Sequence, residues 1–366
     1  MQFTAKVLKV LLCVALGLAL SGPALAWNDR GHMTVAYIAY KQLTPTTRDR
    51  VNALLKLNPK YSDWSATVDK QVPGASADDK SLMIFMIAAT WADGIKRDSA
   101  YTQDGSQNGN RPDGSPDPGK NTGYDDLLMH KYWHFIDTPF TTDGTALPAI
   151  PTPNAQERIA LFRTVLASTS ADPLKSYDLT WLLHLGGDVH QPLHASTRVS
   201  STDPNGDSGG NLAKLSCTRC ELHAFWDHLP GTSNNLKTVV KAARKLQAAG
   251  AALAAKSDEK DWITESFMES QQTVYASPIA AGKWAVYIDR LVQKECGKIG
   301  EGASRVGGSS IGEFAKYGVE VAHVVTSFAD CGARERRHGI PCPMGKRHAM
   351  IRVAGGCLVC GCGPAE

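Results

Sequence analysis

Two pairs of residues in the chain have the spacing of metal ligands. His184 and Asp188 are four residues apart, and so are His223 and Asp227. Residues at this spacing lie on one face of a helix, so each pair can direct an imidazole and a carboxylate at a common ion. His194 follows the first pair after a proline, which disfavours helix at the preceding residue and should turn His194 back toward the same face. Imidazoles and carboxylates together are a ligand set that suits zinc.

Asp93 and His134 extend this set upstream. The apolar run from Ser81 to Trp91 predicts a buried helix with Asp93 at its C-terminal end. A buried carboxylate needs a cation or hydrogen-bond donors. A single histidine among apolar residues is more often a hydrogen-bonded core residue than a ligand. Two His/Asp pairs and two further residues of the same types are difficult to explain in that way, so we predict a metal centre.

The first 26 residues have the pattern of a secretory signal. Lys6 and Lys9 supply the positive charge at the start of the signal. Val10 to Leu20 is an apolar run, and Ala24-Leu-Ala26 fits a cleavage site. We therefore expect the mature protein to be secreted or periplasmic. No other segment is long and apolar enough to span a bilayer, so we expect no membrane anchor.

Cleavage after Ala26 would make Trp27 the first residue. The α-amine is weakly basic among protein amines, so it can reach the neutral, metal-binding form near physiological pH. His32 lies five residues further on, and Gly31 before it lets the backbone turn. Processing would then complete a metal site. The alternative is that Trp27 is an ordinary buried aromatic residue at a domain edge.

The composition bounds the size and the charge of the mature chain. Removing 26 of 366 residues leaves 340, enough to bury a sizeable single core or two smaller ones. Lys and Arg exceed Asp and Glu by 39 − 36 = 3, and two of those lysines leave with the signal. A nearly neutral chain does not bind a polyanion through a broad basic surface, so local charges or metal ions must do so.

The apolar residues recur at helical spacing, and no segment shows sustained alternation, which together predict an all-α protein. The long segment Asp98 to Asp125 and the shorter Pro148 to Pro153 have the composition of loops. The predicted helices are Thr34–Leu43, Thr46–Leu57, Ser81–Trp91, Ala155–Ala167, Leu179–Asp188, Lys237–Ala255, Trp262–Tyr275 and Ile279–Glu295.

Taken in order along the chain, these residues resemble the motifs of one family. The motifs are Trp27-x4-His32, Trp91-Ala-Asp93, His134-Phe-Ile-Asp137, His184-x3-Asp188-x5-His194, Gly209-Gly-Asn211 and His223-x3-Asp227. They resemble the trinuclear-zinc nucleases of fungi, plants and bacteria, the S-one and P-one type, which share a fold with bacterial zinc phospholipases C. The resemblance runs from Trp27 to about Tyr287 and implies a mainly helical fold with three zinc ions at the bottom of a cleft.

The resemblance implies a ligand set for each zinc ion. The first ion would bind Asp93, His134, His184 and Asp188. The second would bind the amine and carbonyl of Trp27, with His32 and Asp188. The third would bind His194, His223 and Asp227. Asp188 would then bridge two cations, which lower the pKa of a water molecule between them and supply a nucleophile at neutral pH.

The resemblance also implies contacts with the substrate. Lys96 stands where the family usually has an arginine, and a lysine can neutralise a phosphate oxygen but cannot hold it bidentately. Phe135 and Asp137 match the family's nucleobase site, where the ring stacks on the base and the carboxylate accepts hydrogen bonds from its edge. For Phe135 the alternative is packing in the core.

These residues predict a zinc-dependent endonuclease that cuts single-stranded DNA and RNA. Single strands are favoured because unstacked bases can reach an aromatic side chain. We expect 5′-phosphate products, a 3′-nucleotidase activity on 3′-mononucleotides, and a monomer. One alternative is a phospholipase C of the same fold, which a glutamate in place of Asp227 would favour. Another is a secreted zinc-binding protein without turnover.

The sequence divides into a signal at 1–26, a catalytic domain at 27–295 and a Cys- and Gly-rich tail at 296–366. In a secreted chain Cys217 and Cys220 predict a small loop disulfide. The family ends in an Ala-rich amphipathic helix, whereas this tail is Gly-rich. The tail is either a small appendage held by disulfides or metal, or a frame-shifted or truncated reading. Its cysteines are Cys331, Cys342, Cys357, Cys360 and Cys362.

Overall fold

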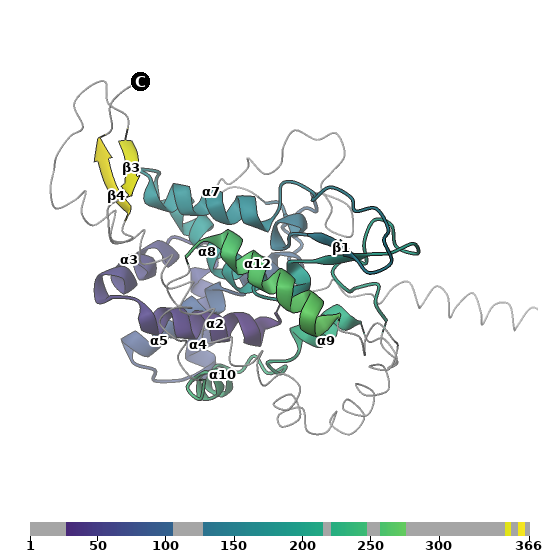
Figure 1. Ribbon diagram of the computed structural model, residues 1–366. Helices are drawn as coiled ribbons and strands as arrows, with labels where there is room; N and C mark the ends of the chain where they lie inside the picture. Colours follow the sequence, from purple (N-terminus) through teal and green to yellow (C-terminus); the bar gives the residue numbers. More distant parts are fainter. Residues whose placement is uncertain are drawn as a thin grey trace, which may run out of the picture.

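The computed structural model describes residues 27–104, 127–214, 221–246 and 257–275, and the backbone of 348–352 and 358–362. This part of the chain is mainly helical, which confirms the predicted fold class (Figure 1). Its helices are α2 Asp29–Gln42, α3 Pro45–Leu55, α4 Tyr61–Gln71, α5 Ala77–Ala88, α6 Trp91–Ile95, α7 Ala155–Ala167, α8 Asp172–Asp188, α9 Leu222–Asp227, α10 Leu236–Ala243 and α12 Glu259–Glu269. Its shorter helical turns are η2 Lys131–His134, η3 Pro192–His194 and η4 Ser270–Val274.

Helix α2 begins five residues before the predicted start because Asn28 caps it. The Asn28 side chain accepts hydrogen bonds from the backbone N–H groups of Arg30 and Gly31. N–H groups in the first turn of a helix lack the carbonyl four residues earlier that would accept from them, so the cap stabilises this end. His32 therefore lies near the start of a helix. The expectation that the backbone turns at Gly31 is wrong.

The apolar segment before Asp93 forms two helices rather than one. Helix α5 ends at Ala88, and α6 carries Asp93 in its first turn. The sequence had predicted Asp93 at the C-terminal end of the apolar helix. That prediction is wrong, because Asp93 lies in the first turn of the next helix, α6. The Thr90 hydroxyl donates to the carbonyl of Ile87 at 2.8 Å, and a local bond of this kind competes with continuation of a helix. The break leaves the carbonyl of Ala89 free to accept a hydrogen bond from His184.

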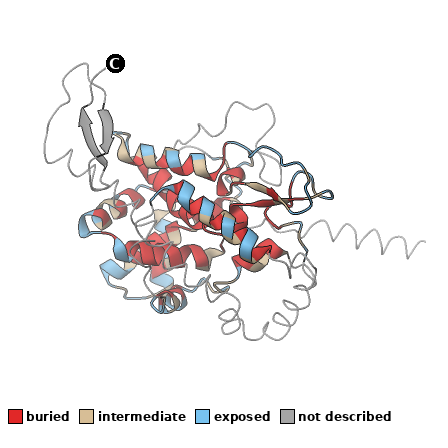
Figure 2. Cartoon of the chain, viewed as in Figure 1, coloured by how far each residue is buried: buried red, intermediate tan, exposed pale blue. Residues whose placement is uncertain are grey.

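Helix α8 passes through the core and carries His184 and Asp188. It packs against α2, α3, α6 and α7, and all its residues from Lys175 to Asp188 are buried (Figure 2). Its Trp181 ring lies edge-on to that of Trp133, 4.9 Å away between centroids. The first half of α8 buries polar residues among the apolar ones, so its apolar residues do not recur on a single face, which is why it gave no helical pattern. Proline at its first turn fits a helix start earlier than Leu179.

The described residues also include two small sheets that the sequence did not predict. β1 (Pro139–Thr141) and β2 (Thr197–Val199) are parallel, with Phe140 opposite Arg198. β3 (His348–Arg352) and β4 (Leu358–Cys362) are antiparallel. Strands of three residues are too short to show alternation, so periodicity could not reveal β1 and β2. Among the described residues, no helix is long and apolar enough to cross a membrane.

Several sequence predictions lie wholly or partly outside the described residues. They are the signal, most of the loop Asp98 to Asp125, the pair Cys217 and Cys220, the helix Ile279–Glu295, and the end of the helix Lys237–Ala255. The tail is described only at β3 and β4. The helix Ala155–Ala167 has the predicted bounds.

Asp178 in α8 gives a pH-dependent prediction for stability. It is buried and accepts no hydrogen bond within the described part of the chain. Burial raises the pKa of Asp178 to about 8, although Arg158 lowers it in part. A carboxyl whose pKa is raised in the folded state stabilises the fold at low pH, and this contribution is lost as the pH rises from about 4 toward about 8.

We therefore expect Asp178→Asn, which cannot ionise, to be more stable than the wild type at pH 8 by about 1–3 kcal/mol. At pH 4 the difference should disappear. Urea unfolding at the two pH values measures it. The same difference in unfolding free energy at both pH values would contradict this prediction.

Candidate metal centre

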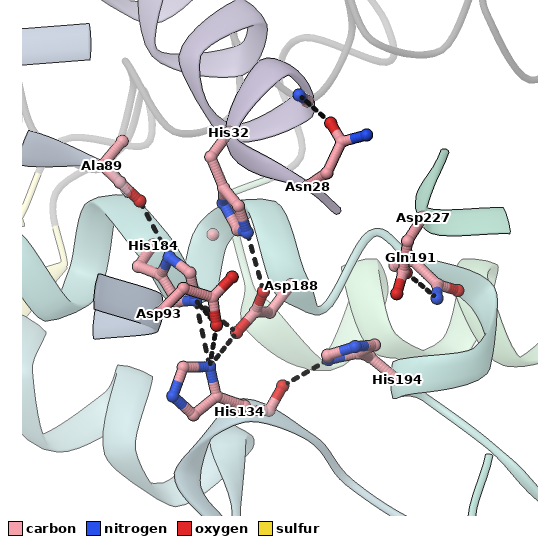
Figure 3. A network of polar contacts seen from close by, with 12 residues as sticks. Asn28, His32, Ala89, Asp93, His134, His184, Asp188, Gln191, His194 and Asp227 are labelled. Atoms are coloured by element: carbon pink, nitrogen blue, oxygen red, sulfur yellow. Dashed lines mark hydrogen bonds and ion pairs between the residues drawn. The ribbon is translucent and has the colours of Figure 1, made fainter. Parts of the chain in front are cut away.

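Four buried side chains from α6, η2 and α8 meet at one point (Figure 3). The Oδ2 atom of Asp188 lies 2.9 Å from Nδ1 of His134 and 3.2 Å from Nε2 of His184. The two imidazole nitrogens are 3.0 Å apart. The Oδ1 atom of Asp93 lies 3.9 Å from the His134 nitrogen and 3.7 Å from the His184 nitrogen. We call these four residues the first cluster.

The first cluster fits a tetrahedral zinc ion. Zinc bonds of about 2.0–2.2 Å place neighbouring tetrahedral ligands about 3.3–3.6 Å apart. The five separations, from 2.9 to 3.9 Å, lie around that value. Oδ2 of Asp93 and Oδ1 of Asp188 are buried without a hydrogen bond from the described residues. Carboxylate oxygens in that situation need a cation.

Hydrogen bonds to the backbone fix how the ring of His184 presents its nitrogens. Its Nδ1 lies 2.8 Å from the carbonyl oxygen of Ala89, so Nδ1 carries the hydrogen and donates it. Nε2 is then the nitrogen that faces Asp93 and Asp188, and in the neutral ring it offers its lone pair to a metal ion. This is the arrangement of a metal-binding histidine whose other nitrogen is held by a hydrogen bond.

His32 reaches the other oxygen of Asp188. Its Nε2 lies 3.2 Å from Oδ1 of Asp188, and its ring stacks on that of His184 with centroids 3.9 Å apart. Neither ring nitrogen of His32 has a hydrogen-bond partner among the described residues. Gly187 makes this approach possible, because a Cβ atom there would lie 2.7 Å from Nδ1 of His32. His32, Asp93 and His184 also offer atoms close enough for one ion.

Trp27 is buried beside the start of α2. A Cβ atom on Gly31 would lie 2.6 Å from the Cβ of Trp27, so glycine is needed for this close packing. In the full chain the nitrogen of Trp27 forms the peptide bond to Ala26. That the α-amine of Trp27 binds a metal ion after cleavage therefore stays a prediction.

His194, His223 and Asp227 form a second cluster, close enough for one ion. The Nε2 atoms of the two histidines are 3.1 Å apart, and Oδ2 of Asp227 lies 3.7 Å from Nε2 of His223. The second pair does lie on one helix, α9. The predicted turn at the proline is also present, because Gln191 is extended and η3 follows it.

The Nε2 atoms of the two imidazoles in the second cluster face each other, and each carries a lone pair when its ring is neutral. His194 donates from Nδ1 to the carbonyl of His134 at 2.7 Å, and His223 donates from Nδ1 to the carbonyl of Gly209 at 2.7 Å. Both Nε2 atoms are then acceptors in the neutral rings. Burial lowers the pKa of His223 to about 3, so a proton does not join them near neutral pH. A cation between the two nitrogens removes this repulsion, so the donor set fits a metal ion.

Charges around the centre act on each carboxylate differently. Burial alone would raise the pKa of Asp188, but His184, His134 and His32 together hold it well below its usual range. Burial raises the pKa of Asp227 well above its usual range, and the amide of Gln191, which donates to it at 2.8 Å, offsets this only in part. Asp227 therefore needs a nearby cation to be ionised at neutral pH.

The three residues predicted to contact substrate lie next to the first cluster in sequence. The Nζ of Lys96 donates to Oδ1 of Asp93 at 2.8 Å, and its side chain is only 4% exposed. Phe135 is partly buried, with its ring packed against the core. Burial raises the pKa of Asp137 to about 7, with a smaller contribution from Asp207.

Sequence reasoning missed the groups that hold the ligands in place. They include the carbonyls of Ala89, His134 and Gly209, and the side chain of Gln191. Backbone carbonyls carry no sequence signal. Gln191 lies between His184 and His194, where its polar amide in an apolar stretch was a usable signal. His190, in the same stretch, is also buried, and its ring packs against that of Trp262.

The mainly helical fold brings imidazoles and carboxylates together in two buried clusters that could hold metal ions. The model of the S1/P1 nuclease family matches residues 27–305, and the chain belongs to this family. The match begins at Trp27. A search of curated proteins found no match. The protein is therefore a nuclease by family, and the described residues hold His/Asp groups that can bind metal ions.

Proposed function

We propose that this protein is a secreted or periplasmic zinc-dependent endonuclease that hydrolyses single-stranded DNA and RNA. The nuclease family supports the reaction class. The observation that carries the choice of metal is the convergence of buried imidazole nitrogens and carboxylates in two clusters, together with the Oδ2 of Asp93, which accepts no hydrogen bond from the described residues. Nitrogen and oxygen donors in near-tetrahedral arrangement suit zinc.

Three ions would be held by this chain. The first cluster would hold one, the second cluster another, and His32 with Asp188 and the processed Trp27 a third. When bound, zinc activates a water molecule and stabilises negative charge on phosphate oxygens. The protein fixes the ligands with backbone hydrogen bonds, so little reorganisation is needed when substrate binds.

Side chains beside the first cluster would position the substrate. Lys96 places a cation there, which can neutralise one phosphate oxygen. Phe135 can stack on an unpaired base, and this favours single strands because a duplex keeps its bases stacked inside. With its pKa raised to about 7, Asp137 is partly protonated near neutrality and can both donate to and accept from a base edge. The same contacts would accept 3′-mononucleotides.

The products of cleavage give a test of the reaction. Water attacks phosphorus in line with the departing 3′ oxygen, which leaves 5′-phosphate and 3′-hydroxyl ends. No 2′-hydroxyl takes part, so we expect single-stranded DNA to be cut as well as RNA. Cyclic phosphate ends, or cleavage of RNA alone, would contradict this mechanism.

A parallel assay separates the nuclease from the phospholipase of the same fold. The zinc-loaded mature protein is incubated with oligonucleotides and with phosphatidylcholine, before and after chelation. We expect nucleic acid to be cut only when zinc is present, and phosphatidylcholine to remain intact. Hydrolysis of phosphatidylcholine alone would overturn the proposed substrate, and zinc binding without any hydrolysis would overturn the proposed activity.

A further inference from the structure

The loop 206–210 touches the second cluster at His223. The carbonyl of Gly209 accepts the hydrogen bond from Nδ1 of His223 at 2.7 Å, and the carbonyl of Gly210 accepts one from the His223 backbone N–H at 3.4 Å. Both glycines have positive φ, +59° and +80°, a conformation that other residues rarely adopt. The direction of the Gly209 carbonyl, and with it the orientation of the His223 ring, therefore depends on how this loop is held.

Asp207 holds the loop from within. It is 2% exposed, and its Oδ1 accepts hydrogen bonds from the backbone N–H groups of Gly210 and Arg198, both at 3.0 Å. One contact fixes the loop to itself and the other fixes it to strand β2. A carboxylate that accepts several such bonds is a strong anchor, because charge-assisted hydrogen bonds are shorter and stronger than neutral ones.

Tyr275, the last residue of the described range 257–275, completes this arrangement. Its hydroxyl lies 3.0 and 2.9 Å from the two oxygens of Asp207, and the ring is buried. The guanidinium of Arg198 lies over the Tyr275 ring, 4.8 Å from its centroid. Gly210 leaves the space for the hydroxyl, because a Cβ atom there would lie 3.2 Å from it. The chain of contacts runs from Tyr275 through Asp207 and the loop to His223.

We infer that Asp207 and Tyr275 are positioning residues for the metal ion of the second cluster, an inference that rests on the proposed zinc binding. Neither residue is a ligand. Asp207 sets the loop so that the Gly209 carbonyl fixes the nitrogen that His223 presents, and Tyr275 fixes Asp207. Groups of this kind, one step removed from the metal, typically change metal affinity about 10–100-fold when they are lost.

The test measures zinc affinity in the mature protein by competition with a chromogenic chelator. We expect Tyr275→Phe and Asp207→Asn each to weaken one zinc ion about 10–100-fold and to leave the other ions unchanged. Combining Tyr275→Phe with Asp227→Asn, which removes a ligand of the same ion, should weaken zinc binding no further than Asp227→Asn alone. Additive losses, or equal weakening of every ion, would overturn the assignment.

Tyr40→Phe is the matched control. Tyr40 is also buried, and its hydroxyl pairs with Asn52 rather than with a group linked to the metal centre. It should lower the melting temperature about as much as Tyr275→Phe does, without changing zinc affinity. If Asp207→Asn does not fold, Tyr275→Phe decides the question alone. Wild-type zinc affinity in Tyr275→Phe would contradict the inference, whereas absence of zinc from the wild type would contradict the proposed function itself.

Discussion

Asp188→Asn is expected to reduce the rate of phosphodiester cleavage more than about 100-fold at saturating zinc. Loss of an outer partner of a ligand already costs about 10–100-fold, and Asp188 contacts imidazoles through both oxygens. Oδ1 lies 3.2 Å from His32, while Oδ2 lies 2.9 Å from His134 and 3.2 Å from His184. A carboxylate in that position can join two ions, and asparagine has one oxygen and no charge.

Asp227→Asn is the matched comparison. Asp227 gives one oxygen to Gln191 at 2.8 Å, which leaves the other for a single ion. Its replacement should therefore lose less activity than that of Asp188, and it should remove one zinc ion rather than two. The measurement is kcat on a single-stranded oligonucleotide for both variants. Equal residual rates would show that Asp188 does not bridge two ions.

Adding one residue before Trp27 of the mature protein should remove one zinc ion and most of the activity together. The addition converts the α-amine into a peptide nitrogen, which no longer binds metal. His32 and Asp188 would then have to hold their ion without the Trp27 amine. Zinc analysis of the purified protein gives the metal content, and the oligonucleotide assay gives the rate.

A variant whose added segment carries a protease site provides the control for this experiment. Cleavage that restores Trp27 as the first residue should restore both the zinc ion and the activity, which separates loss of the amine from misfolding. Full zinc content and full activity in the uncleaved variant would leave Trp27 as an ordinary buried aromatic residue.

The sequence predicted the His/Asp pairs of the metal centre better than it predicted the ends of the helices around them. The i, i+4 pairs lie on α8 and α9, where a local rule places an imidazole and a carboxylate on one face. Asp93 was placed on the wrong helix because an apolar run does not reveal a break at Thr90. The start of α2 was missed because its first turn is polar, although Asn28 is a recognisable cap.

The contacts that orient the ligands could not be predicted in the same way. The carbonyls of Ala89 and Gly209 come from other parts of the chain than the histidines they hold. The link from Tyr275 to Asp207 joins residues 68 positions apart. Such pairings depend on how helices and loops pack in three dimensions, and the period of apolar residues carries no information about them.

Anomalous diffraction at the zinc absorption edge, from crystals of the mature protein, tests zinc binding at these sites most directly. We expect three anomalous peaks in each molecule: one among Asp93, His134, His184 and Asp188, one beside His32 and Trp27, and one among His194, His223 and Asp227. No peak at the first cluster, or zinc bound only at other sites, would contradict the proposed centre.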